Sequence, residues 1–221
     1  MINISPRLKQ ISSFVEDNSK IIDIGCDHGL VDIHLMQTKK NLQILASDIN
    51  KNALNNAINN IKKYNYTDKI KTQVSDGIKD IDTTAYDTII ISGMGAHTIV
   101  GILYQSIKKL KPIKTIIIQS NNDIEFLREK ITKLNYYIED EELVKEKKFI
   151  YTVIKFKKGK KRYTKKQLYF GPILLEKNNK IFQEKNKIDK EKLTILYRLI
   201  PKSHYKLKLK TYLKLHMYKN I

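Results

Sequence analysis

The sequence predicts an α/β fold: a mostly parallel sheet closed by an antiparallel hairpin, followed by a helical hairpin at the C-terminal end. Two observations support this prediction. Five apolar, mostly β-branched stretches alternate with helix-like segments, as in parallel strands joined by crossover helices. Two later strand-like stretches, 136–142 and 149–156, are too close in sequence for a helix between them, so they must pair antiparallel or not pair at all. The predicted parallel strands are residues 20–24, 42–48, 70–74, 86–92 and 114–119.

The first strand runs into a loop that carries two glycines, Gly25 and Gly29, before a helix starts at Leu30. Such a loop brings backbone N–H groups and a helix N-terminus close to a ligand. Its G-x-x-x-G spacing differs from the G-x-G-x-x-G of dinucleotide-binding loops. Asp23 at the strand end and Asp27 in the loop favour a cationic ligand, and S-adenosylmethionine, with its ammonium and sulfonium, fits this demand. The alternative is an ordinary tight connection between a strand and a helix.

Acids also end the second and third strands. Asp48 follows Asp23 by 25 residues, about one strand–helix–strand step, and an acid there can accept both hydroxyls of a ribose. Asp76 and Gly77 follow the third strand, where Asp76 can accept from the exocyclic amine of an adenine. Asp76 also suits a simple Asx turn. The acids together are more informative than any one of them.

The fourth and fifth strands end in glycines and amides. Gly93, Met94 and Gly95 follow the fourth strand and allow the backbone to approach a ligand closely. The fifth strand ends in a run of neutral side chains, Gln119-Ser-Asn-Asn122. With the antiparallel hairpin that follows, this order of elements is that of the Rossmann-like class I methyltransferase fold and argues against a dehydrogenase.

A short amphipathic helix is predicted before the first strand, over residues 5–16, with Ser5 as N-cap and Pro6 at the first helical position. Arg7 lies on the polar face of this helix. A solvated Arg7 is the simple interpretation, and a contact with substrate or cofactor is the alternative.

The length of 221 residues suits two domains, which we place at 1–156 and 157–221. No apolar stretch reaches the roughly 18 residues of a membrane span, and the N-terminus lacks the pattern of a signal peptide. We therefore expect a soluble, cytoplasmic protein with no membrane partner. A single cysteine, Cys26, excludes an intramolecular disulfide and a metal site built from cysteines, and we expect no metal.

The formal net charge is +19, and most of it lies in the second domain. Residues 1–155 carry 22 basic and 19 acidic side chains, whereas residues 156–221 carry 20 and 4. A nucleic acid is the obvious partner, because phosphates neutralised by lysine and arginine release counterions. A lysine-rich bias of the whole proteome is the alternative, but it would spread lysine over both parts. The connector residues expected to contact RNA are Lys160, Lys161, Arg162, Lys165 and Lys166.

Apolar residues recur every seven positions in the second domain, which predicts a coiled-coil-like stripe. The repeat consists of Leu174, Ile181, Ile188 and Ile195, with Leu199 at the neighbouring seam position. Polar residues at the other seam position make the stripe weak, so we expect a helical hairpin within one chain, and a monomer. Pro201 ends the first helix of this hairpin, and residues 204–218 form the returning helix.

Several of these stretches match one family in both order and spacing. They are residues 5–8, Asp23-Ile-Gly-Cys-Asp-His28, Asp76-Gly77, Ser92-Gly-Met-Gly95, Gln119-Ser-Asn121 and Gly171-Pro172. On these stretches the chain resembles the bacterial tRNA (adenine-22-N1)-methyltransferases over nearly its whole length. It departs from the family pattern at Ala96 in place of glycine, at Ser120 in place of proline, and at Gly29-Leu-Val-Asp32 in place of an aromatic, leucine, proline run.

The resemblance implies transfer of a methyl group from S-adenosylmethionine to N1 of an adenine in the D-arm of tRNA, at position 22. We expect the acid Asp27 and the amides Asn121 and Gln119 to be the catalytic residues, and Arg7 with the basic connector to contact the substrate. The implied cofactor-binding residues are Asp23, Gly25, Asp27, His28, Asp48, Ile49, Asp76, Gly77, Gly93, Met94 and Gly95. His28 suits bracing of the loop as well as it suits a contact.

The chemistry can be compared with these residues. N1 of adenine carries a lone pair at neutral pH, so its attack needs no general base and positioning supplies most of the acceleration. The methylated ring is cationic, so nearby acids and amide oxygens are favourable. The target base must be unpaired or extruded. Two alternatives stay open: a noncatalytic RNA-binding protein with a degenerate Rossmann core, and a methyltransferase for a protein or small molecule.

Overall fold

The computed structural model describes residues 1–220. The chain divides into two compact units, Met1–Arg162 and Tyr163–Ile221, and each is described by itself. No helix in the described part of the chain is both long and apolar enough to cross a bilayer.

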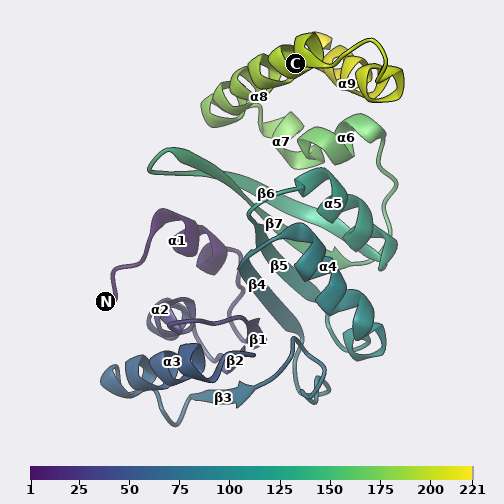
Figure 1. Ribbon diagram of the computed structural model, residues 1–221. Helices are drawn as coiled ribbons and strands as arrows, with labels where there is room; N and C mark the ends of the chain where they lie inside the picture. The colour runs from purple at the N-terminus through teal and green to yellow at the C-terminus, as the bar shows by residue number, and fades with distance from the viewer. Residues whose placement is uncertain (221) are drawn as a thin grey trace. The chain divides into compact units, whose positions relative to one another are not determined.

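The first unit is built on one seven-stranded sheet with the order β3-β2-β1-β4-β5-β7-β6 (Figure 1). The first five strands are parallel, β7 lies antiparallel to β5, and β6 lies antiparallel to β7. The predicted fold is therefore confirmed. The strands are β1 (Lys20–Ile24), β2 (Gln43–Asp48), β3 (Ile70–Val74), β4 (Thr88–Met94), β5 (Thr115–Ser120), β6 (Tyr136–Glu146) and β7 (Phe149–Lys158).

Helices cover both faces of this sheet, with α1, α2 and α3 on one side and α4 and α5 on the other (Figure 1). The central strands β4 and β5 contribute isoleucines that are fully buried, which is why their sequence is continuously apolar rather than alternating. The helices are α1 (Pro6–Ser13), α2 (Leu30–Thr38), α3 (Lys51–Lys63), α4 (Ala96–Gln105) and α5 (Ile124–Lys133), with a 3₁₀ turn η1 (Ile107–Leu110) after α4.

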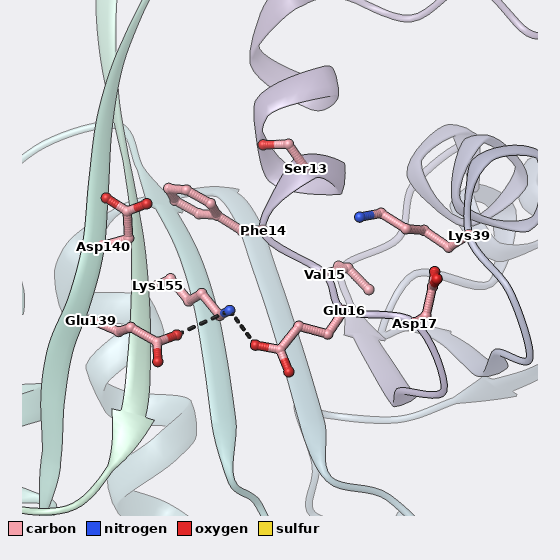
Figure 2. Close-up of a pocket in the computed structure, with 9 residues that line it drawn as sticks. All are labelled: Ser13, Phe14, Val15, Glu16, Asp17, Lys39, Glu139, Asp140 and Lys155. Atoms are coloured by element: carbon pink, nitrogen blue, oxygen red, sulfur yellow. Dashed lines mark hydrogen bonds and ion pairs between the residues drawn. The ribbon is translucent and has the colours of Figure 1, made fainter.

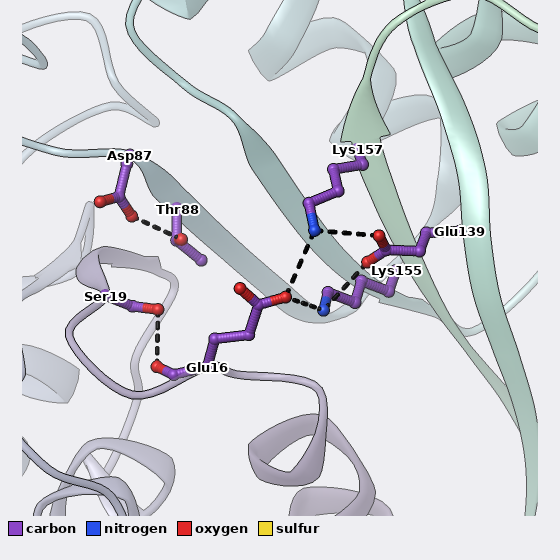
Figure 3. A network of polar contacts seen from close by, with 7 residues as sticks. All are labelled: Glu16, Ser19, Asp87, Thr88, Glu139, Lys155 and Lys157. Atoms are coloured by element: carbon purple, nitrogen blue, oxygen red, sulfur yellow. Dashed lines mark hydrogen bonds and ion pairs between the residues drawn. The ribbon is translucent and has the colours of Figure 1, made fainter.

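Helix α1 begins as its sequence predicts. The Ser5 side chain accepts the backbone N–H of Leu8, and Pro6 occupies the first turn. After α1 the chain passes along the end of the sheet at which the parallel strands begin. There Glu16 forms ion pairs with Lys155 and Lys157 of β7, at 2.6 and 3.4 Å, and both lysines also pair with Glu139 of β6 (Figures 2 and 3). This network connects the segment that follows α1 to the hairpin β6–β7.

Two adjoining hollows, of about 510 and 180 Å³, lie beside this network. Phe14, Glu16 and Lys155 line both of them, and the smaller one reaches Thr88 and Thr115, where β4 and β5 begin (Figures 2 and 3). Both hollows therefore lie at the ends where the parallel strands begin, whereas the loops that carry the predicted site residues follow the carboxyl ends of these strands. Glu16, Glu139, Lys155 and Lys157, which line them, already pair with each other, so we assign the hollows a structural role.

The second unit is helical and contains α6 (Lys165–Phe170), α7 (Pro172–Lys177), α8 (Lys180–Leu199), α9 (Tyr205–Met217) and a 3₁₀ turn η2 (Tyr218–Asn220). The rings of Tyr169, Phe170 and Tyr218 pack edge to face at its centre, with centroids 4.7–5.9 Å apart. The rings of Tyr197 on α8 and Tyr212 on α9 lie 6.2 Å apart, so these two helices pack side by side.

The predicted heptad stripe of this unit is wrong as a buried seam. Leu174 is buried, but the side chains of Ile188, Ile195 and Leu199 are 37%, 57% and 73% exposed. Asn178 adopts a left-handed conformation between α7 and α8, so Leu174 lies in a different helix from the other repeat positions. In α8 the buried positions are instead Phe182 and Asn186. Helices α8 and α9 still form a helical hairpin, but α8 buries a different face from the predicted one.

Candidate active site

The loop after β1 is held tightly against β2. The backbone N–H groups of Gly25 and Cys26 both donate to the carbonyl of Ser47, at 2.8 and 3.0 Å. Gly25 has φ +73°, and a Cβ there would lie 2.3 Å from the Cε atom of Met94. The positive φ favours glycine at this place, where the side chain of Met94 at the end of β4 packs close to the loop after β1. Burial raises the pKa of the Cys26 thiol, so Cys26 acts as a small, neutral residue that fills space in the loop rather than as a reactive thiol.

Asp23 lies beneath this loop with a side chain that is only 3% exposed. Burial, followed by the nearby negative charge of Asp48, raises the pKa of Asp23 to about 7. A buried carboxyl without a cation is costly. The site therefore favours a positively charged group near Asp23.

A second buried acid, Asp32, is a residue that the sequence analysis did not select. It lies in the first turn of α2, is fully buried, and has no hydrogen-bond partner on either carboxylate oxygen. Burial and the neighbouring Asp23 raise its pKa well above the usual value. Its place among apolar helix residues gave no signal in the sequence.

Asp48 ends β2 next to this loop. Its two carboxylate oxygens accept the backbone N–H groups of Asp27 and Asn50, at 3.2 and 2.8 Å. Each oxygen keeps a further lone pair, and the side chain is partly exposed. Ile49 follows with a side chain that is 66% exposed, and Asp76 is exposed at the end of β3. Two free acceptors beside an exposed apolar side chain suit a ribose and the face of a purine.

The ends of β4 and β5 form a network of oriented amides. The backbone N–H and carbonyl of Gly93 bind two side chains, one near the end of β5 and one directly after it. Gln119 Oε1 accepts the N–H of Gly93 at 3.0 Å, and Asn121 Nδ2 donates to the carbonyl of Gly93 at 2.7 Å. Gln119 Nε2 in turn donates to Asn121 Oδ1 at 3.1 Å. Gln119 is buried and Asn121 is exposed, so the network presents one amide to the surface.

Arg7 reaches this network from α1. Its Nη1 donates to Gln119 Oε1 at 2.5 Å, and its guanidinium lies over the ring of Tyr151 on β7, 5.1 Å from the centroid. The backbone N–H of Arg7 donates to Glu146 of β6 at 3.2 Å. Tyr151 and Glu146 were not predicted from sequence, because their distance along the chain from Arg7 hides the contact.

A local irregularity in β4 makes the network possible. Pairing of β4 with β5 shifts register between Ser92 and Met94, and Gly93 between them has φ +79°. This bulge turns the Gly93 peptide toward β5. Ala96 and Ser120, the departures from the family pattern, are accommodated here. The Ala96 N–H donates to Asn122 Oδ1 at 3.0 Å, and the Ser120 hydroxyl donates to the carbonyl of Asn122 at 2.9 Å.

Not every predicted residue lies with these groups. Gly77 is buried, and a Cβ there would lie 2.6 Å from Ile102 of α4, so helix packing accounts for this glycine. His28 is exposed, with Nε2 3.5 Å from Asp27. The end of β7 pairs with the start of β5. The connector residues that follow β7, Lys160, Lys161 and Arg162, therefore lie toward the end where the parallel strands begin, away from the loops at the carboxyl ends. Lys165 and Lys166 belong to α6 of the second unit.

The residues of the first unit that meet at the carboxyl ends of the parallel strands fit S-adenosylmethionine. Asp23 needs a cation, the Asp48 oxygens have lone pairs left for hydroxyl donors, and Ile49 offers an apolar face. When bound, this cofactor would supply the transferable methyl group.

Comparison with known proteins agrees with this geometry. The family model of tRNA (adenine(22)-N(1))-methyltransferase, TrmK, matches residues 21–220. This chain belongs to that family. The tRNA (adenine(22)-N(1))-methyltransferase of Bacillus subtilis is 25% identical over 190 residues, covering 83% of this chain and 80% of that protein.

Solved structures of similar proteins share the TrmK fold. A protein of the NADB-Rossmann superfamily from Streptococcus agalactiae is 29% identical, with a TM-score of 0.92 and coverage of 98% of this chain and 96% of that one. TrmK from M. capricolum, in complex with S-adenosyl-homocysteine, is 27% identical, with a TM-score of 0.83 and coverage of 97% and 95%. The chain is a tRNA adenine-N1 methyltransferase that uses S-adenosylmethionine, and its family membership argues against both alternatives left open by the sequence.

Proposed function

We propose that this TrmK protein methylates N1 of adenine 22, in the D-arm of tRNA, at the carboxyl ends of strands β1, β2, β4 and β5. The observation that carries this proposal is the meeting of two features in one unit. Acids with unused acceptor capacity end β1 and β2, and an oriented amide network ends β4 and β5, with Met94 and Gly25 in contact between them. The family match supplies the position of the target adenine.

The acids of the first two strands would hold the cofactor. Asp23 places negative charge beneath the Gly25 loop, where it would favour the ammonium group. Asp48 would accept the two ribose hydroxyls with the lone pairs that Asp27 and Asn50 leave free. Ile49 would lie against the adenine face, and Asp76 would accept from its amine. Asp27, which is exposed beside Asp48, is the acid we place nearest the methyl group.

The reaction is a direct displacement. The N1 lone pair of the target adenine forms the new N–C bond, the electrons of the C–S bond return to sulfur, and the positive charge passes to the adenine ring. No proton has to leave before the attack, so the protein acts by orientation and by charge. Asn121 and Gln119 would orient the base, and Asp27 would stabilise the cationic product.

The basic residues would contact the rest of the tRNA. Lys160, Lys161 and Arg162 lie toward the sheet edge opposite the amide network, so we assign them to phosphates remote from the target adenine. Lys165 and Lys166 extend this positive charge into the second unit. Arg7, which already binds Gln119, would add a donor near the base. A monomer acting in the cytoplasm completes the proposal.

Mass spectrometry of tRNA tests the proposal directly. Cells that lack this protein should lose 1-methyladenosine from position 22 and keep other tRNA modifications. Purified protein should then restore the methyl group to that tRNA with S-adenosylmethionine as donor, and should not methylate a transcript with guanine at position 22. Methylation at another adenine would keep the enzyme class and reject the position. No methylation of any tRNA would reject the function.

A further inference from the structure

The amide network at the ends of β4 and β5 is bounded by groups that can act only as donors or only as acceptors of hydrogen bonds. A guanidinium and a backbone N–H can only donate, so Arg7 and Gly93 both require the oxygen of the Gln119 amide. The Gln119 NH₂ group must then face Asn121, and it does so at 3.1 Å. A backbone carbonyl can only accept, so Gly93 requires the NH₂ group of Asn121, and that bond is 2.7 Å long. Every bond therefore selects the same orientation of both amides.

The exposed amide is left with one unused site of each kind. An amide oxygen has two lone pairs and an amide nitrogen has two hydrogens. Among the contacts of the described residues, Gln119 takes one lone pair of Asn121 Oδ1 and Gly93 takes one hydrogen of Nδ2. Asn121 thus presents one acceptor and one donor at the surface of the site, in an order set by residues behind it.

An acceptor beside a donor matches one edge of adenine. The N6 amine donates and N7 accepts, and an asparagine amide pairs with both at once. Guanine has acceptors at both places, so the same amide cannot pair with it in this way. Pairing on the N6–N7 edge also leaves N1 unbound, as an attacking lone pair must be.

We propose that Asn121 recognises the target adenine through its N6–N7 edge, and that Gln119 and Arg7 act as positioning residues that fix the orientation of the Asn121 amide. This inference rests on the proposed function and specifies how that site selects its base. Tyr151, whose ring lies against the Arg7 guanidinium, holds the far end of the network in place.

A substrate lacking only N7 tests the contact. Two tRNAs are prepared that differ at the target position alone, one with adenosine and one with 7-deazaadenosine, whose N1 and N6 amine are unchanged. The full-length enzyme should methylate the deaza substrate with a kcat/KM lower by roughly 2- to 10-fold, the loss expected for half of a bidentate base contact. Equal kcat/KM for the two tRNAs would reject the inference while leaving the proposed function intact. Failure to methylate the adenosine tRNA would reject the function itself.

Variants then locate the contact. Asn121→Asp keeps an acceptor for the N6 amine but has no donor for N7, so its preference for adenosine over 7-deazaadenosine should fall to about one. Asn122→Asp is the matched control, because the neighbouring side chain uses its oxygen to accept from Ala96, and this variant should keep the full preference. A preference that persists in Asn121→Asp would show that another group binds N7.

Arg7 variants test the positioning role even where Asn121 variants lose all activity. Arg7→Lys keeps a group that can only donate and should preserve the preference for N7. Arg7→Ala leaves the Gly93 N–H, among the contacts of the described residues, as the one donor that holds the Gln119 oxygen. The Gln119 amide is then less firmly oriented and the preference should shrink, while the affinity for S-adenosylmethionine, measured by calorimetry, stays unchanged. If Arg7→Ala lowers kcat/KM equally for both tRNAs, Arg7 acts only by contacting the RNA or by supporting the fold, and the positioning role is rejected.

Discussion

Asp48 holds the loop after β1 and, in the proposed site, also binds the cofactor. Each of its oxygens holds a backbone N–H, from Asp27 or from Asn50. These two bonds fix the plane of the carboxylate, so its remaining lone pairs point in set directions. Pre-oriented acceptors bind hydroxyl donors without a further cost in side-chain freedom.

Replacement of Asp48 by alanine should weaken binding of S-adenosylmethionine by roughly 1–3 kcal/mol, because the ribose hydroxyls lose their partners. Isothermal titration calorimetry measures the change, with thermal unfolding as the check that the loop still folds. Asp80→Ala, which removes an exposed acid elsewhere in the first unit, is the control and should leave the affinity as it is. Unchanged affinity in a folded Asp48→Ala protein would remove this residue from the ribose site.

Asp23 makes the stability of the cofactor-free protein depend on pH. Burial raises its pKa to about 7 in the folded state, from a value near 4 in the unfolded chain. Between these values the folded state binds more protons than the unfolded state, so the free energy of unfolding should fall as the pH rises from about 4 to about 7. Asp32, which is buried without a partner, acts in the same direction.

Asp23→Asn should therefore flatten this dependence, because the amide cannot ionise. Urea unfolding at pH 5, 6, 7 and 8 measures the slope for both proteins, and the variant should gain most relative to the native chain at pH 8. Asp80→Asn is again the exposed control. The same slope in native and Asp23→Asn proteins would mean that Asp23 is not the titrating group.

At the scale of elements, α1 is held at both ends. Its first turn binds Glu146 and Gln119 through Arg7, and the segment after it is paired with Lys155 through Glu16. The hydrogen bond from Lys155 lowers the pKa of Glu16, as expected for a carboxylate that gains a cation. Helix α1 is short, so these contacts rather than helix propensity determine where Arg7 lies.

The pair of Arg128 and Glu141 fastens α5 to the edge strand β6. Their Nε and Oε1 atoms are 2.6 Å apart, and both side chains are almost completely buried. Arg128→Met should lower the free energy of unfolding by about 3–5 kcal/mol, because it leaves the Glu141 charge buried without this partner. Denaturant unfolding measures the loss. The double variant Arg128→Met, Glu141→Leu should recover much of it, and a double variant as unstable as the single one would contradict this account.

Elements and site residues differ in how far the sequence predicts them. Asp23, Asp48, Gln119 and Asn121 were predicted because they end strands, and the ends of parallel strands meet whatever the details of packing. The bulge at Gly93 and the contact of Arg7 with Gln119 could not be predicted, since both depend on the register between elements distant in sequence.

The second unit shows the opposite error. Its seven-residue repeat predicted a buried stripe, but the repeat spans a break at Asn178 that sequence periodicity does not register. Periodicity reports a face only while one helix continues. The repeat does continue within α8, but the buried positions there are Phe182 and Asn186, and Ile195 and Leu199 lie exposed.

At the scale of the whole molecule, the charge is divided unevenly along the chain. Residues 1–155 have nearly as many acids as bases, while residues 156–221 have 20 bases and 4 acids. A tRNA bound mainly through phosphates would thus gain most of its affinity from the second part, and that affinity must depend on salt.

Full-length variants can test this division without removing any part of the fold. Lys202, Lys206 and Lys210 are exposed in or before α9, and replacing all three by glutamine should weaken tRNA binding and flatten the slope of log affinity against log salt by up to about 2–3 units, roughly 0.7–0.9 for each phosphate that is no longer neutralised. The matched control replaces three exposed lysines of the first unit, Lys62, Lys69 and Lys79. It should leave the slope nearly unchanged, and both variants should bind S-adenosylmethionine normally. If the two triple variants flatten the slope equally, the tail lysines act only through net charge, and the RNA has no preferred binding site on α9. If neither variant flattens the slope, other residues bind the phosphates, and the connector residues Lys160–Arg162 are the next to be replaced.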